Sequence, residues 1–274
     1  MPATGGGRGR NRRQYPDRQR AHDAATGRPP SGPAANRTGA IRGNEVGSPK
    51  RVASADALPP YLSAHYWWAY IHPNAVRVFE RQWLVNLILW GNYARLRDAM
   101  LAELGEPLRG ATLQVACVYG DLTRRLCERV AAGDSIDVVD VLPIQLGNLR
   151  KKLPRSAPVR LLAMDSSDLR LSTASYDQAF AFFLLHEQPA HYRDRTLAEL
   201  FRVVKPGGKI VIVDYARPRW WNPLRYLWAP VLAALEPFAL DLWRREIADW
   251  LPRGAASRKE LFFGGLYQKV VIQR

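Results

Sequence analysis

The segment Thr112-Leu113-Gln114-Val115-Ala116-Cys117-Val118-Tyr119-Gly120-Asp121-Leu122-Thr123 decides the fold. Its first six residues are mostly β-branched or apolar and predict a buried strand over 112–117. A turn with a single glycine follows, and residues 122–132 then read as a helix closed by Gly133. Strand, tight turn and helix start together form a nucleotide-type binding site, because the first turn of a helix presents unpaired N–H groups.

A second short strand, 135–140, ends on an acid that belongs to the same predicted site. Asp140 lies twenty positions after Gly120 (140 − 120). At about that separation an acid reaches the ribose hydroxyls of a ligand held in the first turn. The two strands therefore predict an adenosine-containing cofactor bound across the carboxyl ends of a parallel sheet.

The turn itself narrows the choice of cofactor. A dinucleotide loop requires G-x-G-x-x-G, so that backbone can approach a pyrophosphate closely. Here only Gly120 is kept, with Ala116, Val118 and Tyr119 at neighbouring positions, which disfavours NAD and FAD. A smaller, non-phosphorylated adenosyl ligand such as S-adenosylmethionine fits better, since it needs one close approach and one ribose acid. An α/β domain with an ordinary tight turn and no ligand stays open as the alternative.

The positive charge of the chain is unevenly distributed. The 274 residues carry a formal net charge of +15, and residues 1–58 hold ten Arg and one Lys against three Asp and one Glu, a net +7. This segment is rich in Gly, Pro, Ser and Ala, and we expect it to be disordered because it cannot bury enough apolar surface. Its one aromatic residue, Tyr15, argues against a nucleic-acid partner. Attraction to an anionic membrane surface is the more useful implication.

Cysteine use indicates neither a disulfide framework nor a zinc site. There are two cysteines, Cys117 at the end of the first predicted strand and Cys127 within the following helix. A reducing compartment is the natural interpretation of this pattern.

Residues 59–110 predict an aromatic-rich helical segment. Five aromatic residues fall between positions 61 and 70, and a helix is expected from His72-Pro73 to Trp90. A second helix is expected over 93–104, ending at Gly105. The aromatic stripe predicts either ordinary helix packing or an apolar entrance for a lipid-like substrate. The apolar run 83–90 is far too short for a bilayer, which needs roughly 20 residues.

Residues 111–274 predict an α/β domain, because strands alternate with helices and therefore form a parallel sheet covered on both faces. Asp140, Asp165, His186 and Asp214 then fall at the carboxyl ends of strands, where such sheets bind ligands. Two strands around Gly264-Gly265 predict a closing antiparallel hairpin. The expected strands are 112–117, 135–140, 158–164, 176–184 and 208–214, and the expected helices are 122–132, 142–153 and 189–203.

The segment 217–250 interrupts this alternation. It combines aromatic residues, arginines and four prolines, and its prolines and Glu236 rule out a spanning helix. Aromatic residues beside arginines predict a lid that lies in a membrane interface, with guanidinium groups toward lipid phosphates. A surface helical insertion packed on its own core is the alternative.

The order of these elements resembles class I S-adenosylmethionine-dependent methyltransferases, over roughly residues 110–274. The resemblance is carried by the strand–turn–helix, the acid-ended second strand, Met164-Asp165-Ser166, Leu185-His186-Glu187 and the turn Lys205-Pro206-Gly207-Gly208. The lid after the fifth strand resembles that of the quinone-ring C-methyltransferases of ubiquinone and menaquinone synthesis.

A closer resemblance, over about residues 59–274, is to the methyltransferase-like rhodoquinone biosynthesis proteins. It is carried by Tyr66-Trp67-Trp68-Ala69-Tyr70-Ile71-His72-Pro73, Ile88-Leu89-Trp90-Gly91-Asn92-Tyr93 and Val115-Ala116-Cys117-Val118-Tyr119-Gly120-Asp121-Leu122. This resemblance implies a Rossmann-like methyltransferase fold and conversion of ubiquinone to rhodoquinone, in which an amino group replaces a ring methoxy group. It further implies S-adenosylmethionine as amino donor, assistance by Mn²⁺, and a peripheral location on the cytoplasmic side of a bacterial inner membrane. No oligomeric state follows.

The resemblance also implies site residues. Those for the cofactor are Cys117, Tyr119, Gly120, Asp121, Asp140, Asp165 and Ser166, those for catalysis are Tyr119, Gln114 and His186, and no metal ligands can be singled out. Gln114 stands where methyltransferases commonly have an acid, so we expect it to lower the pKa of the cofactor's amine and free its lone pair. Tyr119 is bulkier than the usual residue and would push the methionine arm toward the quinone.

Two other functions stay open on the residues alone. One is a true C- or O-methyltransferase that acts on a polyprenyl quinone or phenol. The other is a non-catalytic module that uses the cofactor pocket or the lid structurally.

Overall fold

The computed structural model describes residues 58–66, 78 and 81–274. The predicted disordered tail, apart from Leu58, and the predicted helix start at His72-Pro73 lie outside the described residues. The predicted aromatic run is described only as far as Tyr66.

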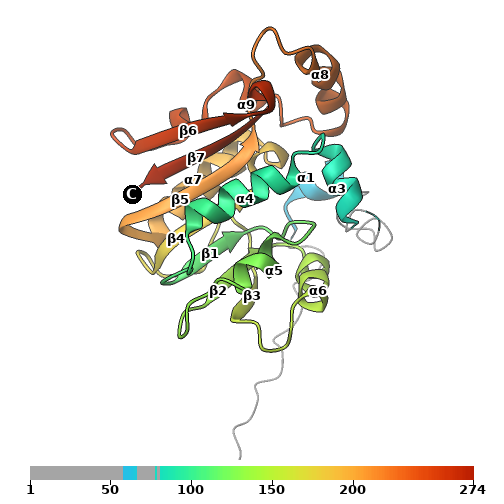
Figure 1. The fold of residues 1–274 in the computed structure, drawn as a ribbon. Helices are drawn as coiled ribbons and strands as arrows, with labels where there is room; N and C mark the ends of the chain where they lie inside the picture. The colour runs from blue at the N-terminus through green and yellow to red at the C-terminus, as the bar shows by residue number, and fades with distance from the viewer. Residues whose placement is uncertain (1–57, 67–77, 79–80) are drawn as a thin grey trace, which may run out of the picture. The chain divides into compact units, whose positions relative to one another are not determined.

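A seven-stranded, mostly parallel sheet forms the centre of the described chain, with strand order β3-β2-β1-β4-β5-β7-β6 (Figure 1). Strands β1 to β5 pair in parallel, whereas β7 pairs antiparallel with β5 on one side and with β6 on the other. This confirms the predicted α/β fold and its closing hairpin. The strands are β1 Thr112–Val115, β2 Ile136–Asp140, β3 Val159–Ala163, β4 Tyr176–Phe182, β5 Val204–Tyr215, β6 Ala256–Phe262 and β7 Tyr267–Gln273.

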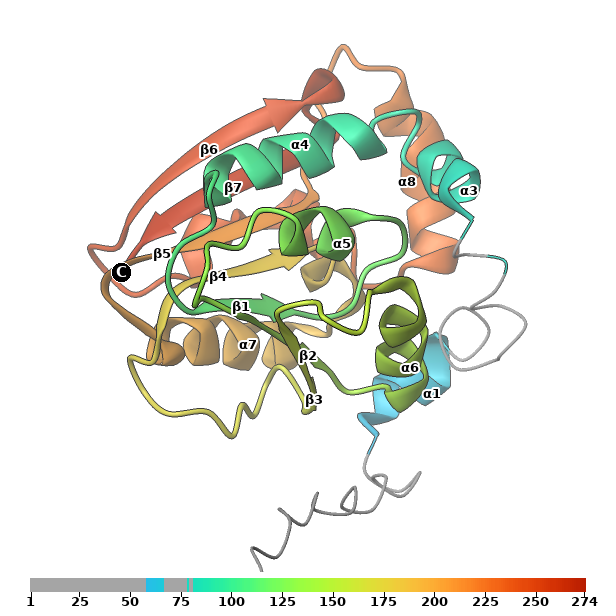
Figure 2. The ribbon, with the colours of Figure 1, turned by 60° about the horizontal axis from the view of Figure 1, so that its bottom comes forward.

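Helices lie on both faces of the sheet, as the alternation predicts. Helices α4 and α5 lie over one face, and α7 lies on the opposite one (Figures 1 and 2). The α-helices are α1 Pro60–His65, α3 Gln82–Ile88, α4 Tyr93–Leu104, α5 Leu122–Cys127, α6 Pro143–Lys152, α7 Ala190–Val203, α8 Leu224–Leu235 and α9 Asp241–Arg244, and the 3₁₀ turns are η3 Leu185–Glu187, η4 Ile247–Trp250 and η5 Phe263–Gly265.

The core is built around the middle strands of the sheet. All four residues of β1 are buried, as are six of the seven residues of β4, because helices cover both faces there. Strand β6 forms one edge, and six of its seven residues are exposed. The central strands are therefore buried along nearly their whole length, including polar residues such as Gln114 and Gln178, whereas the edge strand is mostly exposed.

Most element boundaries differ from the prediction by one or more residues, and three of these differences have a clear local reason. Strand β1 ends at Val115 because Ala116 takes φ 70° and turns the chain. Helix α5 stops at Cys127 rather than 132, because the following segment pairs with Leu108, whose carbonyl accepts from the Ala131 N–H at 2.9 Å. Strand β5 begins at Val204, so the Lys-Pro-Gly-Gly turn forms an irregularity inside the strand, opposite a register shift in β4.

The helices before the sheet and the lid after it meet near the carboxyl ends of the strands. The aromatic ring of Tyr61 in α1 lies 6.4 Å from that of Phe238 in the lid, measured between centroids. The ring of Trp90, after α3, lies 5.3 Å from that of Trp228 in α8. In the described part of the chain, no helix has both the length and the apolar character needed to cross a membrane.

Candidate functional site

A cavity of about 480 Å³ opens at the carboxyl ends of the strands. Its wall combines the β1–α5 turn, the ends of β2, β3 and β4, and side chains from α3 and α8. Of the predicted site residues, it is lined by Cys117, Tyr119, Asp140, Asp165, Ser166 and His186. Gln114, Gly120 and Asp121 are not among the lining residues.

Asp140 is fixed at the end of β2 with both carboxylate oxygens engaged on one side. Oδ2 accepts the Cys117 N–H at 2.7 Å, and Oδ1 accepts the Leu142 N–H at 2.8 Å. Burial raises the pKa of this carboxyl to about 6, although these two hydrogen bonds oppose the rise. A carboxylate has about four acceptor positions, and the Cys117 thiol, a weak donor that a ligand hydroxyl can displace, takes the third of them. The arrangement fits a vicinal diol such as that of a ribose.

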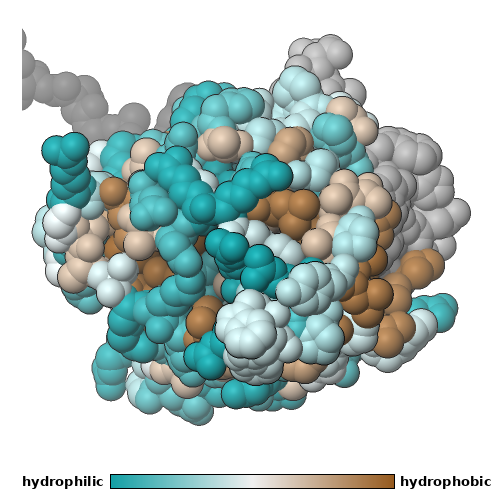
Figure 3. Space-filling view, turned by 90° about the horizontal axis from the view of Figure 1, so that it is seen from above, coloured by the Kyte–Doolittle hydropathy of each residue, from teal (hydrophilic) through white to brown (hydrophobic). Residues whose placement is uncertain are grey.

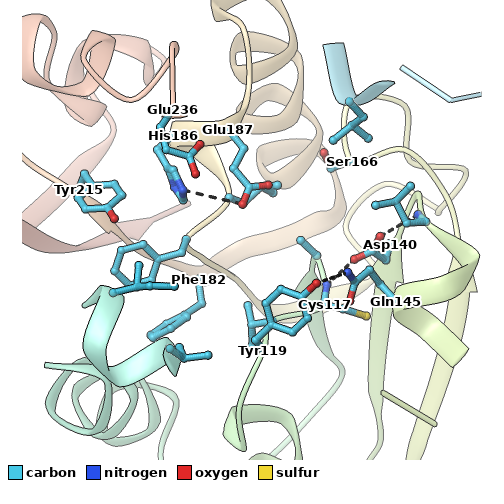
Figure 4. A pocket seen from close by; sticks show the side chains of 18 of the residues that line it. Cys117, Tyr119, Asp140, Gln145, Ser166, Phe182, His186, Glu187, Tyr215 and Glu236 are labelled. Atoms are coloured by element: carbon cyan, nitrogen blue, oxygen red, sulfur yellow. Dashed lines mark hydrogen bonds and ion pairs between the residues drawn. The ribbon is translucent and has the colours of Figure 1, made fainter. Parts of the chain in front are cut away.

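Tyr119 and Gln145 form one wall of the cavity beside Asp140 (Figure 4). The Gln145 amide, on α6, donates to the Tyr119 hydroxyl at 2.8 Å and so fixes the phenol ring over the turn. Sequence reasoning missed Gln145, because a lone glutamine on a helix carries no motif.

Asp165 and Ser166, in the turn after β3, line the cavity on the other side of Asp140. The Ser167 N–H donates to Asp165 Oδ1 at 2.8 Å, and the Gln188 amide donates to Ser166 Oγ at 2.9 Å. These bonds fix the turn in place. Both residues stay proposed contacts of the cofactor's base.

Gln114 is used inside the protein rather than in the cavity. Its side chain is 1% exposed, donates to the Ala116 carbonyl at 3.0 Å and accepts from Thr123 Oγ1 at 2.9 Å. The amide therefore joins the end of β1 to the start of α5. Any effect of Gln114 on a bound cofactor would act through the shape of the turn, since Gln114 does not line the cavity.

Asp121 anchors the same turn to α4. Its carboxylate lies 2.9 Å from Arg97 Nη1 and 2.6 Å from Arg125 Nε, and it accepts from the Tyr93 hydroxyl at 3.1 Å. Burial alone would raise the pKa of Asp121, but the two arginines and Tyr93 outweigh it and hold the pKa below its usual value. Asp121 and the adjacent Gly120 thus support the site from behind its wall.

A second polar group lies at the other end of the cavity, centred on His186 (Figure 4). His186 Nδ1 lies 3.0 Å from Asp214 Oδ1, and Nε2 lies 3.8 Å from Glu187 Oε1. Burial would lower the pKa of His186, but Asp214, Glu236 and Glu187 outweigh it and raise the pKa to about 9. The histidine is therefore cationic at neutral pH.

Sequence reasoning missed three residues at this end, namely Tyr61, Tyr215 and Glu236, all of which line the cavity. The ring of Tyr215 lies 4.9 Å from that of His186, nearly perpendicular to it. Glu236 follows α8 in the lid, and burial raises its pKa. Tyr61 and Glu236 carry no local signal, because they reach the cavity only through the packing of α1 and the lid, whereas Tyr215 is the last residue of β5 and directly follows Asp214 at a strand end.

A manganese site is not supported by the described residues. They contain no group of three or more His, Cys, Asp or Glu side chains arranged to hold a metal ion. The expected Mn²⁺ thus has no matching donor set in the part of the chain that the structure describes, and we derive no step through it.

Comparison with known proteins identifies the domain that holds this cavity. Residues 112–208, which run from β1 into β5, match the family described as methyltransferase domain. About a third of the chain is therefore similar to methyltransferase domains, and this third includes Asp140, Asp165 and His186 of the cavity wall.

Relatives of the chain include an uncharacterized methyltransferase of Synechocystis sp., which is 25% identical over 209 residues. The match covers 74% of this chain and 92% of that relative. The ubiquinone/menaquinone biosynthesis C-methyltransferase UbiE of Geobacter sp. is 30% identical over 138 residues, 49% of this chain and 58% of the relative. The chain thus matches a little more than half the length of that quinone methyltransferase.

Among solved structures, an O-methyltransferase family protein from Burkholderia thailandensis has a TM-score of 0.51 and 18% identity. The match covers 69% of this chain and 58% of that one. At this identity the likeness concerns the fold alone.

Proposed function

We propose that this protein transfers the methyl group of S-adenosylmethionine to the ring of a lipid-like quinol or phenol. The observation that carries the proposal is a single cavity with a diol-binding acid, Asp140, at one end and an apolar wall ending in His186 at the other. The similarity to UbiE of Geobacter sp. supports a quinone-type acceptor. The cavity volume of about 480 Å³ lies within the range of small-molecule sites.

One set of lining residues would bind S-adenosylmethionine, and another set would bind the acceptor. Asp140 would accept the ribose hydroxyls, Asp165 and Ser166 would border the base, and Tyr119 would direct the methionine arm. The part of the cavity proposed for the acceptor is apolar. It is lined mainly by side chains of α3 and α8, namely Leu84, Val85, Ile88, Trp228, Val231 and Leu235. Such a wall binds a ring with a hydrocarbon tail by removing apolar surface from water.

Bound S-adenosylmethionine supplies an electrophilic methyl group on its sulfonium. The protein's own part is to hold the acceptor ring beside that methyl and to exclude water, since positioning alone supplies a large share of catalysis. Helices α3 and α8 meet through Trp90 and Trp228 and close the apolar side.

A second candidate is the exchange of a ring methoxy group for an amino group. The observation in its favour is the altered first turn, in which Gln114 is neutral and Ala116 and Val118 stand where methyltransferases commonly carry glycine. Ala116 nevertheless takes the left-handed conformation, with φ 70°, that glycine adopts more easily. Ala116 therefore has the backbone conformation that a glycine would have at this position of the turn, which agrees with ordinary cofactor binding and with methyl transfer.

Isotope labelling separates the two reactions. Purified protein would be incubated with a short-chain demethylated quinol or with ubiquinone, and with S-adenosylmethionine labelled either in its methyl group or in its amino nitrogen. We expect the methyl label to appear in the quinol, whose mass grows by one CH₂. An amino label in the product, with loss of the methoxy group, would establish amination instead. Cofactor binding without any product would contradict both.

We further propose that the protein attaches peripherally to an anionic membrane, from which the acceptor enters. Trp83 and Leu87 of α3 and Trp220 and Trp221 before α8 are 61%, 65%, 75% and 54% exposed. Figure 3 views the molecule from the side of α8 and shows apolar residues exposed there among hydrophilic ones. Arg217 and Arg219 are exposed next to the tryptophans and suit lipid phosphates, and the net charge is +15.

Replacing both Trp220 and Trp221 by serine is expected to weaken binding to phosphatidylglycerol vesicles by about tenfold or more, because each indole buries apolar area at the interface. Vesicle co-sedimentation measures the effect. The matched control is Leu261→Ser, since Leu261 is 40% exposed on the edge strand β6. Equal loss in both proteins, or none in either, would contradict the assigned surface.

A further inference from the structure

Ionisable side chains from three separate elements converge at the end of the cavity away from Asp140. His186 comes from η3, Asp214 from the end of β5, and Glu236 from the residue that follows α8. His186 and Glu236 line the cavity, and Figure 4 shows them together with Glu187 on one side of Phe182. Asp214, fully buried, lies behind His186.

We propose that His186 and Glu236 form the binding site for the oxygen of a phenolic acceptor ring, with His186 Nε2 donating a hydrogen bond to that oxygen and Glu236 accepting its proton. This inference rests on the proposed methyl transfer. It adds an acceptor class, a phenol or quinol, and two catalytic residues with separate tasks.

The geometry around His186 assigns it the role of donor. Its Nδ1 faces Asp214 at 3.0 Å, so Nε2 is the nitrogen left for a ligand. The contact of Nε2 with Glu187, at 3.8 Å, is too long for a hydrogen bond. The raised pKa of His186, about 9, keeps a proton on Nε2 at neutral pH. A cationic donor stabilises a developing phenolate.

Asp214 is a positioning residue. Its Oδ2 accepts the Leu185 N–H at 2.8 Å, and its Oδ1 accepts the Tyr215 N–H at 2.7 Å. These backbone bonds fix the orientation of the Asp214 carboxylate. In that orientation it bonds to His186 Nδ1, on the side of the imidazole ring away from the cavity. Asp214 therefore acts on the acceptor only through His186.

Glu236 has the properties of a proton acceptor. Its Oε2 is buried and has no hydrogen-bond partner among the described atoms. Burial raises the pKa of Glu236, whereas His186 and Tyr66 oppose the rise and Asp214 adds to it. Glu187, Tyr61 and Tyr215 are the other titratable groups that line this end of the cavity. A carboxylate in this setting is a stronger base than one in water.

In the proposed methyl transfer the phenol O–H bond breaks, and its proton goes to Glu236. The phenolate attacks the sulfonium methyl, the new bond to carbon or oxygen forms, and the electron pair of the broken C–S bond stays on sulfur. After attack through a ring carbon, the ring proton moves to the ring oxygen and restores the hydroxyl. One proton therefore remains on Glu236 in either case and leaves to solvent.

The test uses the full chain and two readouts. The first is methyl transfer to a short-chain quinol. The second is the ionisation of a bound nitrophenol, whose ionised form absorbs visible light, in the presence of S-adenosylhomocysteine. We expect Glu236→Gln to lower kcat by about 100-fold and to lower the ionised fraction of the bound nitrophenol at neutral pH. Affinity for S-adenosylhomocysteine should change by less than about twofold, because Asp140 lies at the other end. Glu128→Gln, an exposed change on α5, is the control.

Asp214→Asn tests positioning separately. Removal of the Asp214 carboxylate lowers the pKa of His186, so the alkaline limb of the kcat/KM profile should move to lower pH, which mere loosening of the fold would not do.

The outcomes are distinguishable. If Glu236→Gln ionises the same fraction of the nitrophenol and turns over like the unaltered protein, the inference is wrong and methyl transfer stands. If the unaltered protein transfers no methyl group but ionises a larger fraction of the bound nitrophenol than Glu236→Gln does, the site stands and the proposed function fails. A nitrophenol that does not bind to the unaltered protein overturns the inference.

Discussion

Asp140→Asn is expected to weaken binding of S-adenosylmethionine and S-adenosylhomocysteine on the order of 1,000-fold. Two ribose hydroxyls would donate to a charged carboxylate, and each such bond contributes about 1.5–3 kcal/mol. Asparagine also presents an NH₂ group to one of the two backbone N–H donors, Cys117 or Leu142, that now face carboxylate oxygens. Isothermal titration calorimetry measures the loss directly.

The control for this change is Asp168→Asn. Asp168 is exposed, lies in the loop after β3 and does not line the cavity. Its replacement by Asn makes the same carboxylate-to-amide change close to the site but outside it. Its affinity should stay within about twofold of the unaltered protein. Comparable affinities in the Asp140 and Asp168 variants would show that the ribose does not bind at Asp140.

The pKa of Asp140 adds a pH dependence to the same experiment. Since that pKa is about 6, the carboxyl gains a proton as the pH falls through about 6 and then loses one acceptor position. Cofactor affinity should therefore fall below pH 6 in the unaltered protein and stay flat in Asp140→Asn.

Gly120→Ala is expected to destabilise the fold by about 3 kcal/mol, from strain and overpacking together. Gly120 has φ +91°, and a Cβ there would lie 2.3 Å from the Tyr93 hydroxyl. Tyr93 cannot yield easily, because it is 1% exposed and its hydroxyl is bonded to the Asp121 N–H at 2.9 Å. For a domain of this size the melting temperature should fall by roughly 6–12 °C.

Gly133→Ala separates the clash from the backbone strain. Gly133 has nearly the same φ, +89°, but nothing lies within 4 Å of the added Cβ. We expect about 1 kcal/mol of destabilisation there. Urea unfolding of both variants measures the difference, and equal values would mean that Tyr93 moves aside at no cost.

The two ends of the cavity differ in how they are built. The Asp140 end consists of turns between consecutive strands and helices, in which Gln114 bonds to Ala116 two residues away and the Cys117 N–H bonds to Asp140 at the end of the next strand in sequence. The acceptor end joins η3 and the lid, which are far apart in the chain, with Tyr61 of α1 nearby. Substitutions in the lid are therefore expected to alter the acceptor side first.

The sheet and several of the residues that line the Asp140 end of the cavity could be predicted from the sequence alone. Periodicity and the position of Asp140 predicted strands and helices on both faces, since these depend on neighbouring residues along the chain and on the burial of central strands. Cys117, Tyr119, Asp165 and Ser166 were likewise expected beside Asp140, and they line the cavity with it.

Which side chains complete the cavity depends on how the helices and the lid pack against the sheet. Gln114, Gly120 and Asp121 lie one layer behind its wall, because Ala116 turns the chain at φ 70° and Tyr93 and Arg97 of α4 take the Asp121 carboxylate. Glu236 lies in the site without any motif, since its place depends on the packing of the lid against the ends of the strands, and Gln145 and Tyr215, although close in sequence to Asp140 and Asp214, carry no motif either. A local sequence pattern can predict a turn, but the hydrogen-bond partners of a buried polar group depend on the packing of the whole fold.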